Sequence, residues 1–450
     1  MKSIPHRLKS VAALGLGTSI ILSSGTGAYA SMPDDNGNAP AHSQKEKPEE
    51  VENIIYMIPD GFDAAYATNY RHFKGEEAPV WDEFLTGMMK TDSADNLVTD
   101  SAAAGTAMAR GVKTENGMIG MTPEGDSPDS ILEKSGDAGK STGLVATSTI
   151  THATPAVFGS SVEDRNNEAA IAPQLLENVD VLMGGGRNMF LPESEGGEQE
   201  QDNLIEKAEA DGFTYTENLN DIQASEEEKI LGLFHEEAMS PELERPEEQP
   251  SISEMTTSAI QSLEKDEDGF FLMVEGSQID WAGHAHDAAW AMTDTEAFEM
   301  AVQEAVDYAE AEGNTLVVVA GDHETGGMTV GGYDEYMAKP DVLRDVTATG
   351  NKMASELNDD ASNAAEVLST FTGIDITDEE AERIQNAEDE ETRASEINSI
   401  VSEYAYVGWG TSQHTGTDVP LYAYGAGSEE FTGLLDNTEL PEKMSALIGQ

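Results

Sequence analysis

Four apolar runs of the chain are each followed by residues of the kinds that bind metal ions. The runs span residues 53–58, 142–147, 270–274 and 315–320. The polar residues that follow them are, in the same order, Asp60, His152 with Thr154, Glu275, and Asp322 with His323. A turn or a helix cap would explain any one of them alone. In open α/β sheets, however, ligands bind outside the carboxyl ends of the strands, so we expect these side chains to meet at one edge of a sheet and to bind metal ions.

Two further places supply nitrogen and oxygen ligands. Asp280 and His284 are four residues apart, so one helical turn would place both on a single face, as it would for a surface ion pair. His414 stands before Thr415-Gly416 in a distant part of the chain. The chain has no cysteine, so a metal site must use imidazole, carboxylate and hydroxyl groups. Together these residues are sufficient for two zinc ions.

Ser101 lies in the segment 99–107, whose sequence predicts the start of a helix. Serine or aspartate at such a place most often only caps the helix. The functional alternative is that the helix N-terminus stabilises an anionic group on the Ser101 hydroxyl. A serine hydroxyl is a weak nucleophile unless a base or a metal ion activates it. No partner base is near in the sequence, so a metal ion is the more plausible activator.

Six short apolar runs alternate with segments of helical pattern. They span residues 53–58, 142–147, 179–183, 270–274, 315–320 and 420–424. Continuous apolar character is typical of parallel strands that are buried on both faces, with helices on each side. The pattern therefore predicts an α/β three-layer sandwich with a large, mostly parallel central sheet. Two acidic stretches, 190–260 and 333–405, interrupt it, and we interpret both as surface insertions in one catalytic domain, residues 51–450.

Residues 1–30 have the pattern of a cleaved signal peptide. Basic residues open the segment, an apolar stretch covers residues 11–22, and Ala28-Tyr29-Ala30 precedes the expected cleavage point. The basic residues are Lys2, Arg7 and Lys9. Export would place the protein in the periplasm or outside the cell. Residues 31–50 are polar and are predicted to be a flexible lead-in, and no later run of about 18 apolar residues predicts a membrane span in the mature chain.

The chain is strongly acidic, with 87 aspartates and glutamates against 24 lysines and arginines. Loss of residues 1–30 would move the formal net charge from −63 to −66. This charge excludes nucleic-acid binding that depends on neutralising phosphates. A disordered acidic chain does not fit the apolar fraction of 38% or the recurring strands. We therefore predict a folded protein adapted to high salt, because screening relieves the repulsion between its charges.

Eight segments of the sequence resemble motifs of the alkaline phosphatase family and occur in that family's order. They are Asp60-Gly61, Thr99-Asp100-Ser101-Ala102-Ala103, Gly111-Val112-Lys113-Thr114, Gly184-Gly185-Gly186, Met273-Val274-Glu275-Gly276, Ile279-Asp280, Gly321-Asp322-His323-Glu324-Thr325-Gly326-Gly327 and His414-Thr415-Gly416. The similarity extends from Asn53 to Gly427, and the two acidic stretches fit it only loosely. It implies a metal-dependent hydrolase that splits small phosphate monoesters through a phosphoserine at Ser101. It also implies a homodimer, whose association and activity we expect to increase with salt because like charges oppose association.

The resemblance assigns roles to individual residues of this chain. One zinc ion is expected to be bound by Asp280, His284 and His414. A second zinc ion, which also contacts Ser101, is expected to be bound by Asp60, Asp322 and His323. A third metal ion, normally magnesium, is expected to be bound by Asp60, Thr154 and Glu275. Arg165 aligns with the arginine that holds the phosphate group.

Two positions depart from the family's pattern. His152 stands where many bacterial members have aspartate, and it lies near the third metal ion, so the preference of that site for magnesium over zinc is open. Trp281 stands where some members have lysine, which should alter phosphate release and the pH optimum. His286 matches no ligand of the family, and we interpret it as structural or solvent-facing.

Two other functions are alternatives. A phosphodiesterase of the same superfamily is the closest one, whereas a sulfatase would need a formylglycine pattern that the segment beginning at Ser101 lacks. A non-enzymatic acidic protein that binds cations would explain the charge. It would not explain the combination of Ser101, Arg165 and His414.

Overall fold

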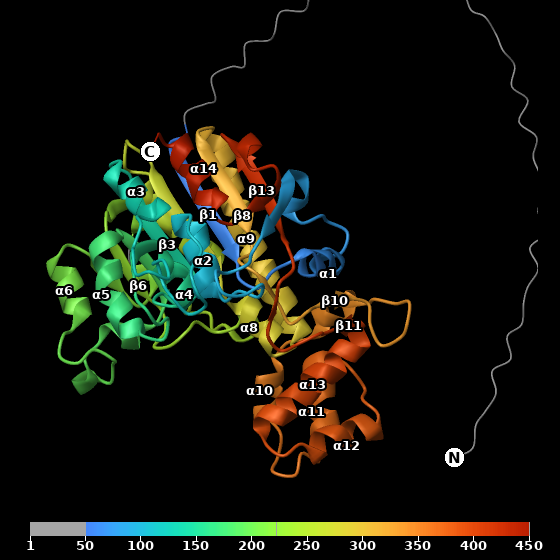
Figure 1. Ribbon diagram of the computed structural model, residues 1–450. Helices are drawn as coiled ribbons and strands as arrows, with labels where there is room; N and C mark the ends of the chain where they lie inside the picture. The colour runs from blue at the N-terminus through green and yellow to red at the C-terminus, as the bar shows by residue number, and fades with distance from the viewer. Residues whose placement is uncertain (1–50, 222, 450) are drawn as a thin grey trace, which may run out of the picture. The chain divides into compact units, whose positions relative to one another are not determined.

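A ten-stranded sheet forms the centre of the computed structural model, which describes residues 51–221 and 223–449 (Figure 1). The strands lie in the order β14-β2-β13-β8-β1-β7-β3-β4-β6-β5. Their bounds are β1 (Asn53–Pro59), β2 (Leu85–Lys90), β3 (Ser141–Thr149), β4 (Val181–Gly185), β5 (Thr214–Thr216), β6 (Ile230–Leu233), β7 (Phe270–Gly276), β8 (Thr315–Ala320), β13 (Val419–Gly425) and β14 (Gly433–Asp436). Neighbouring strands are parallel except around β13, which is antiparallel to both β8 and β2.

Each of the six predicted apolar runs forms a strand of this sheet. The mostly parallel sheet is confirmed, but the run 420–424 lies in β13 and is therefore antiparallel rather than parallel. An apolar run indicates that a strand is buried on both faces, and burial does not depend on the direction of the strand.

Two apolar cores cover the two faces of the sheet and produce the three layers. In β1, Ile55 and Met57 pack in one core, and Ile54 and Tyr56 pack in the other, because successive side chains of a strand alternate between its faces. The first core includes residues of helices α1 (Ala64–Lys74), α7 (Ile252–Leu263), α8 (Gln278–His284) and α9 (Ala288–Glu312), and it continues into the helical segment 350–405. The helices of the second core are α2 (Ser101–Arg110), α3 (Ile131–Asp137), α4 (Ala153–Gly159), α5 (Glu168–Asn178), α6 (Leu204–Ala210) and α14 (Glu439–Leu447).

The acidic stretch 190–260 is only partly a surface insertion. It provides β5 and β6 at one end of the central sheet and helix α7, whose Met255 and Ala259 are fully buried. Its acidic residues, such as Glu254, lie on exposed positions around these elements. The average composition of the stretch therefore concealed short apolar segments that belong to the core.

The second acidic stretch, 333–405, is mainly helical, as its sequence pattern predicts. Its helices are α10 (Gly350–Ser355), α11 (Ala364–Thr372), α12 (Asp378–Asn386) and α13 (Glu390–Ala405), drawn in orange in Figure 1. They are attached to the connection between α8 and α9. The backbone N–H of Gly350 donates to Oδ2 of Asp287 at 2.8 Å, and Nδ2 of Asn398 donates to the carbonyl of Ala285 at 2.9 Å. These helices thus support the segment that follows Asp280 and His284.

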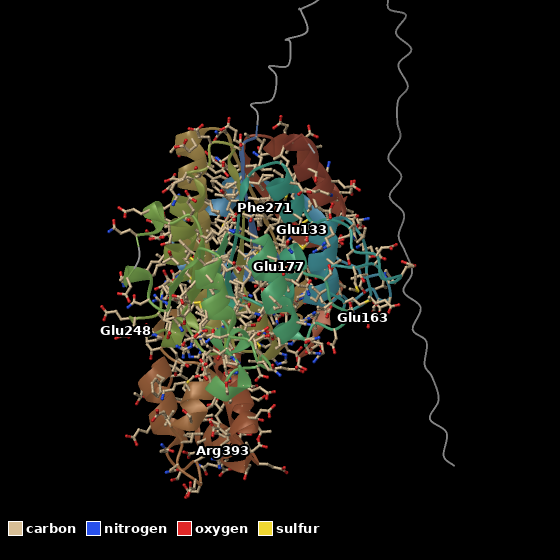
Figure 2. All side chains as sticks on the ribbon, turned by 90° about the vertical axis from the view of Figure 1, so that its left-hand side faces the viewer. Glu133, Glu163, Glu177, Glu248, Phe271 and Arg393 are labelled. Carbon is tan, nitrogen blue, oxygen red and sulfur yellow. The ribbon has the colours of Figure 1, made fainter. Side chains whose placement is uncertain are left out.

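The acidic side chains are mostly on the surface. Of the residues labelled in Figure 2, Glu163, Glu177 and Glu248 are exposed, while Phe271 is fully buried in β7. Among residues 51–221 and 223–449, no helix combines the length and the apolar character needed to cross a membrane. The predicted signal peptide, residues 1–30, and the lead-in, residues 31–50, lie outside the described residues.

Candidate metal and phosphate site

The carboxyl ends of three neighbouring strands bring predicted metal ligands together. Strands β8, β1 and β7 are adjacent and parallel, and Pro59 at the end of β1 lies opposite Gly276 at the end of β7. Asp60 follows β1, Glu275 stands near the end of β7, and Asp322 follows β8. All three carboxyl groups are fully buried.

One group of candidate ligands consists of Asp280, His284 and His414, whose ligand atoms lie within 4.8 Å of one another. Helix α8 places the first two on one face, with Nε2 of His284 3.4 Å from Oδ2 of Asp280. His414 begins β12 (His414–Thr415), which pairs with β9 (Glu324–Thr325). Its Nε2 lies 3.5 Å from Oδ1 of Asp280 and 3.1 Å from Nε2 of His284. Pairing between β9 and β12 therefore completes a site that the helix begins.

A second group surrounds His323. Its Nε2 lies 3.6 Å from Oδ1 of Asp60 and 3.1 Å from Oδ2 of Asp322. Asp60, Asp280 and His323 also have ligand atoms within 4.8 Å of one another. Asp280 therefore belongs to both groups, whereas the resemblance assigns it to one zinc ion. The rings of His323 and His414 stack with their centroids 3.6 Å apart, so the two groups are in contact.

Several buried polar atoms in these groups and beside them make no hydrogen bond with the described residues. They are Asp60 Oδ1 and Oδ2, His152 Nδ1, Thr154 Oγ1, Glu275 Oε1 and Asp322 Oδ2. Burial of a carboxylate costs free energy unless the group is paired or binds a metal ion. Oxygen atoms predominate around Asp60 and Glu275, which suits magnesium, and the mixture of nitrogen and oxygen around His323 suits zinc. The residues present therefore fit metal ions of both kinds.

The burial and close spacing of these carboxyl groups change their pKa values. Burial raises the pKa of Glu275 and that of Asp322 to about 7. Burial and the charges of Asp322, Asp280 and Glu275 raise the pKa of Asp60 well above its usual value. Burial alone would also raise the pKa of Asp280, but its hydrogen bond with His284 and the neighbouring histidines lower it. A bound cation would favour the ionised form of every one of these groups.

The Ser101 hydroxyl lies at the start of α2 and beside the second group. Its Oγ is 3.3 Å from Nε2 of His323, and the residue is 2% exposed. Asp100 caps the helix and accepts a hydrogen bond from the backbone N–H of Ala103 at 2.9 Å. The hydroxyl is therefore close to the positive end of the helix dipole and to candidate metal ligands.

Arg165 is held near the start of α2 by Asp100. Its Nη1 donates to Oδ2 of Asp100 at 2.9 Å, and the same oxygen accepts from the backbone N–H of Gly117 at 3.0 Å. Nη2 of Arg165 lies 3.2 Å from Nε2 of His152. Sequence reasoning considered Asp100 only as a helix cap and missed its pairing with Arg165. No local signal indicates this pairing, because 65 residues separate Arg165 from Asp100 in the sequence.

His152 and Trp281, the two departures from the family's pattern, are in contact. Their rings meet edge to face, with centroids 5.8 Å apart and an interplanar angle of 87°. Burial and the guanidinium group of Arg165 lower the pKa of His152 to about 3. A neutral imidazole can offer a nitrogen to a metal ion. His152 directly precedes α4, which carries Thr154.

Comparison with known proteins places this arrangement in a family. A family model described as alkaline phosphatase matches residues 51–449. The chain belongs to the alkaline phosphatase family. Alkaline phosphatase 3 of Bacillus subtilis is 36% identical over 469 residues, covering 99% of this chain and 97% of that protein. The repressible alkaline phosphatase of Saccharomyces cerevisiae is 35% identical over 442 residues, covering 86% of this chain and 78% of that protein.

Solved alkaline phosphatases have the same fold. The cold-active enzyme from a psychrophilic Shewanella species matches with a TM-score of 0.81 at 33% identity, covering 88% of this chain and 100% of that one. The Thermus thermophilus enzyme matches with a TM-score of 0.80 at 27% identity, covering 92% and 96% of the two chains. The three-layer fold is thus confirmed. The chain is an alkaline phosphatase, an enzyme of a metal-dependent class, and the non-enzymatic alternative is set aside.

His286 of this alkaline phosphatase has contacts typical of a structural residue. Its Nε2 lies 2.7 Å from the carbonyl oxygen of Thr411, and its ring stacks on Trp409 with centroids 5.1 Å apart. It belongs to neither group of candidate ligands. These contacts support its interpretation as structural.

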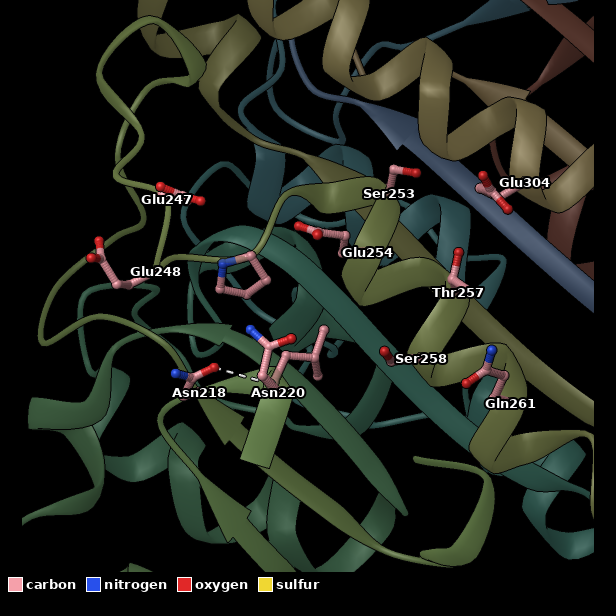
Figure 3. A pocket seen from close by; sticks show the side chains of 12 residues that line it. Asn218, Asn220, Glu247, Glu248, Ser253, Glu254, Thr257, Ser258, Gln261 and Glu304 are labelled. Atoms are coloured by element: carbon pink, nitrogen blue, oxygen red, sulfur yellow. Dashed lines mark hydrogen bonds between the residues drawn. The ribbon is translucent and has the colours of Figure 1, made fainter. Parts of the chain in front are cut away.

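A surface cavity of the phosphatase beside α7 does not suit the substrate. It has a volume of about 350 Å³, and Figure 3 shows Glu247, Glu248, Glu254 and Glu304 around it. These carboxylates would repel an anionic phosphate ester. None of the predicted catalytic residues lines this cavity.

Proposed function

We propose that this alkaline phosphatase hydrolyses small phosphate monoesters through a phosphoserine intermediate at Ser101. The observation that carries the proposal is the position of its hydroxyl, at the N-terminus of α2 and 3.3 Å from Nε2 of His323. Membership of the family supports the monoesterase activity. A phosphodiesterase is the second candidate, because it would use the same kinds of metal ligand.

Three metal ions belong to this proposal, two of zinc and one of magnesium. The first zinc site consists of Asp280, His284 and His414, and the second consists of Asp60, Asp322 and His323 with Ser101. The third site consists of Asp60, Thr154 and Glu275, with His152 beside it. When bound, the ions supply Lewis acids that lower the pKa of the serine hydroxyl and of water and neutralise the leaving oxygen.

The proposed reaction has two steps at phosphorus. In the first, Oγ of Ser101 gives up its proton and forms a bond to phosphorus, the bond to the ester oxygen breaks, and that oxygen takes up a proton as the alcohol leaves. In the second, water attacks phosphorus, the bond to Oγ breaks, and inorganic phosphate leaves while Ser101 recovers its proton. The N-terminus of α2 stabilises the charge of the phosphoseryl group between the two steps.

Arg165 is proposed to hold the phosphoryl oxygens during both steps. Each of its terminal nitrogens carries two N–H groups, of which one at Nη1 is used by Asp100 and one at Nη2 points towards His152. The remaining N–H groups can donate to two oxygens of the phosphoryl group. Asp100 fixes the orientation of the guanidinium, so less freedom is lost when the substrate binds.

The proposal is tested by comparing an aryl phosphate monoester with the corresponding diester. We expect the enzyme to prefer the monoester, and Arg165→Ala to lower kcat/KM for the monoester by about 10–100-fold, since a hydrogen bond to a charged group contributes about 1.5–3 kcal/mol. The diester has one fewer free anionic oxygen, so the variant should lose less with it. Arg187→Ala, which alters an ion pair with Glu217, is the matched control. A preference for the diester would favour the second candidate.

His152 is proposed to weaken the preference of the third site for magnesium, which selects oxygen ligands. Solved variants of TAB5 alkaline phosphatase, 29% identical to this chain, in which a histidine is replaced by glutamate or aspartate are described with Mg bound in the M3 site. These descriptions support the idea that an acid at such a position favours magnesium.

We expect His152→Asp to hold more magnesium than the unaltered enzyme. Both proteins would be equilibrated with equal concentrations of zinc and magnesium, and their metal content measured by atomic emission. His235→Asp, in an exposed loop, provides the same chemical change away from the site. Equal magnesium content in all three proteins would contradict the role given to His152.

Export and adaptation to salt are also proposed. The pattern of residues 1–30 supports a cleaved signal peptide, and the formal charge of −66 without them supports a protein suited to high salt. A homodimer would bring two such charges together. Its association should therefore depend on screening, which acts over about 10 Å at 0.1 M salt and about 3 Å at 1 M.

Protein recovered from outside the cell is expected to begin at Ser31. It is also expected to dimerise more strongly as the salt concentration increases. Mass spectrometry would measure the N-terminus, and sedimentation velocity at about 0.1 M and about 1 M NaCl would measure the mass. Activity measured in the same solutions should increase with salt. Identical mass and activity at both concentrations would count against the salt dependence, and a chain that still begins at Met1 would count against cleavage.

A further inference from the structure

Thr325 connects the two groups of candidate zinc ligands. It follows His323 by two residues and lies in β9, where it pairs with His414. Its Oγ1 donates a hydrogen bond to Oδ1 of Asp280 and lies 3.3 Å from Nδ1 of His323. We infer that Thr325 is a positioning residue that orients Asp280 and His323 together and determines which ring nitrogen of His323 faces the metal. This inference rests on the metal sites of the proposed function.

The direction of these hydrogen bonds follows from the number of protons available. A threonine hydroxyl has one proton, and an ionised carboxylate can only accept. Because Oγ1 donates its proton to Asp280, the contact with His323 requires Nδ1–H to donate to Oγ1. The other ring nitrogen, Nε2, then carries the lone pair.

This tautomer gives Nε2 of His323 surroundings that suit a cation. Nε2 lies 3.1 Å from Oδ2 of Asp322, 3.6 Å from Oδ1 of Asp60 and 3.3 Å from Oγ of Ser101. A lone pair facing two carboxylate oxygens is unfavourable by itself. A metal ion held by these atoms would make every one of the contacts attractive.

The backbone holds the Thr325 hydroxyl in place. The backbone N–H of Thr325 donates to the carbonyl of Gly61 at 3.1 Å, and the backbone carbonyl of Thr325 accepts from the hydroxyl of Tyr66 at 2.6 Å. Thr325 is fully buried. Gly61 makes room for it, because a Cβ at Gly61 would lie 2.9 Å from Oγ1 of Thr325 and 2.9 Å from Cα of Asp280. Every polar group of Thr325 thus has a partner, and its N–H and hydroxyl bond to the segments that carry Asp60 and Asp280.

The test compares Thr325→Val, which removes the hydroxyl at nearly constant volume, with Thr325→Ser, which keeps it. Zinc affinity would be measured by competition with a chromogenic chelator. We expect the valine variant to lose about 10–100-fold in zinc affinity, as is typical when the hydrogen-bond partner of a metal ligand is removed, and the serine variant to retain most of it. Thr68→Val is the control, since the Thr68 hydroxyl donates only to the carbonyl of Ala64.

The outcomes separate this inference from the proposed function. If the unaltered enzyme binds two zinc ions and Thr325→Val binds them equally tightly, the inference is overturned and the proposed function stands. If the unaltered enzyme binds no zinc, both are overturned. Should the valine variant fail to fold, nitrogen-15 NMR of histidine in the unaltered zinc enzyme answers the same question. A proton on Nδ1 of His323 supports the inference, and a metal-bound Nδ1 contradicts it.

Discussion

Replacement of Ser101 by alanine is expected to lower kcat for an aryl phosphate by on the order of 10³-fold or more and to remove the rapid first release of alcohol. Without Oγ, no phosphoserine can form, and hydrolysis must use direct attack by water. The zinc content should stay close to that of the unaltered enzyme, because Asp60, Asp322 and His323 remain. Stopped-flow measurement of the released alcohol would detect the missing burst, and atomic emission would measure the zinc.

A serine elsewhere in the enzyme provides the matched control for this substitution. Ser445 is buried in α14, and its hydroxyl donates to the carbonyl of Pro441 at 2.7 Å. Ser445→Ala removes a buried hydroxyl without touching the site, so it should leave kcat and the burst unchanged. A burst that persists in Ser101→Ala would show that another residue is the nucleophile.

Removal of the metal ions is expected to abolish activity, and addition of zinc and magnesium together to restore it. Among the described residues, the one titratable side chain within hydrogen-bond distance of the Ser101 hydroxyl is His323, which is itself a candidate metal ligand, so activation of the hydroxyl is expected to need a metal ion. The purified enzyme would be treated with a chelator, passed through a desalting column and assayed before and after each ion is returned. Full activity after exhaustive chelation would contradict the metal sites as a whole.

The metal-free enzyme should also be less stable than the metal-bound enzyme. The difference in stability should be larger at alkaline pH than at acidic pH. The pKa of Glu275 and that of Asp322 are raised to about 7, so the folded state holds these protons at pH values where the unfolded state has released them. Stability of the metal-free form should therefore decrease as the pH rises to about 7. Thermal unfolding with and without chelator, at pH 5 and at pH 8, would measure the difference. An equal effect of the chelator at both pH values would contradict this expectation.

The alternation of apolar runs with polar segments in the sequence was sufficient to predict most of the fold. Buried strands need continuous apolar residues, so runs such as 53–58 and 315–320 were visible locally and both form strands. The direction of β13 was not visible, because its neighbours β8 and β2 belong to other parts of the chain. Strands β5 and β6 were missed because glutamates dominate the stretch that contains them.

The candidate site also combines features that could be recognised in the sequence with features that could not. Asp60, Glu275 and Asp322 were recognisable because each stands at the end of an apolar run, and the ends of neighbouring parallel strands coincide in space. Ser101 was recognisable from the helix start and its motif. The structure brings these residues together, while their catalytic roles stay predictions.

By itself, the sequence was sufficient to predict which residues carry the chemistry and which strands deliver them, because residue type and apolar character can be read from short stretches of the chain. Tertiary structure alone decided how those residues are oriented. Thr325 reaches Asp280 across 45 residues, and Arg165 reaches Asp100 across 65, so neither hydrogen bond has a local signature. The same is true of Asp280, which lies between two groups of ligands that meet only when β9 pairs with β12. Hydrogen bonds are directional over about 3 Å, and the chain's folding, not its spacing, brings atoms within that distance.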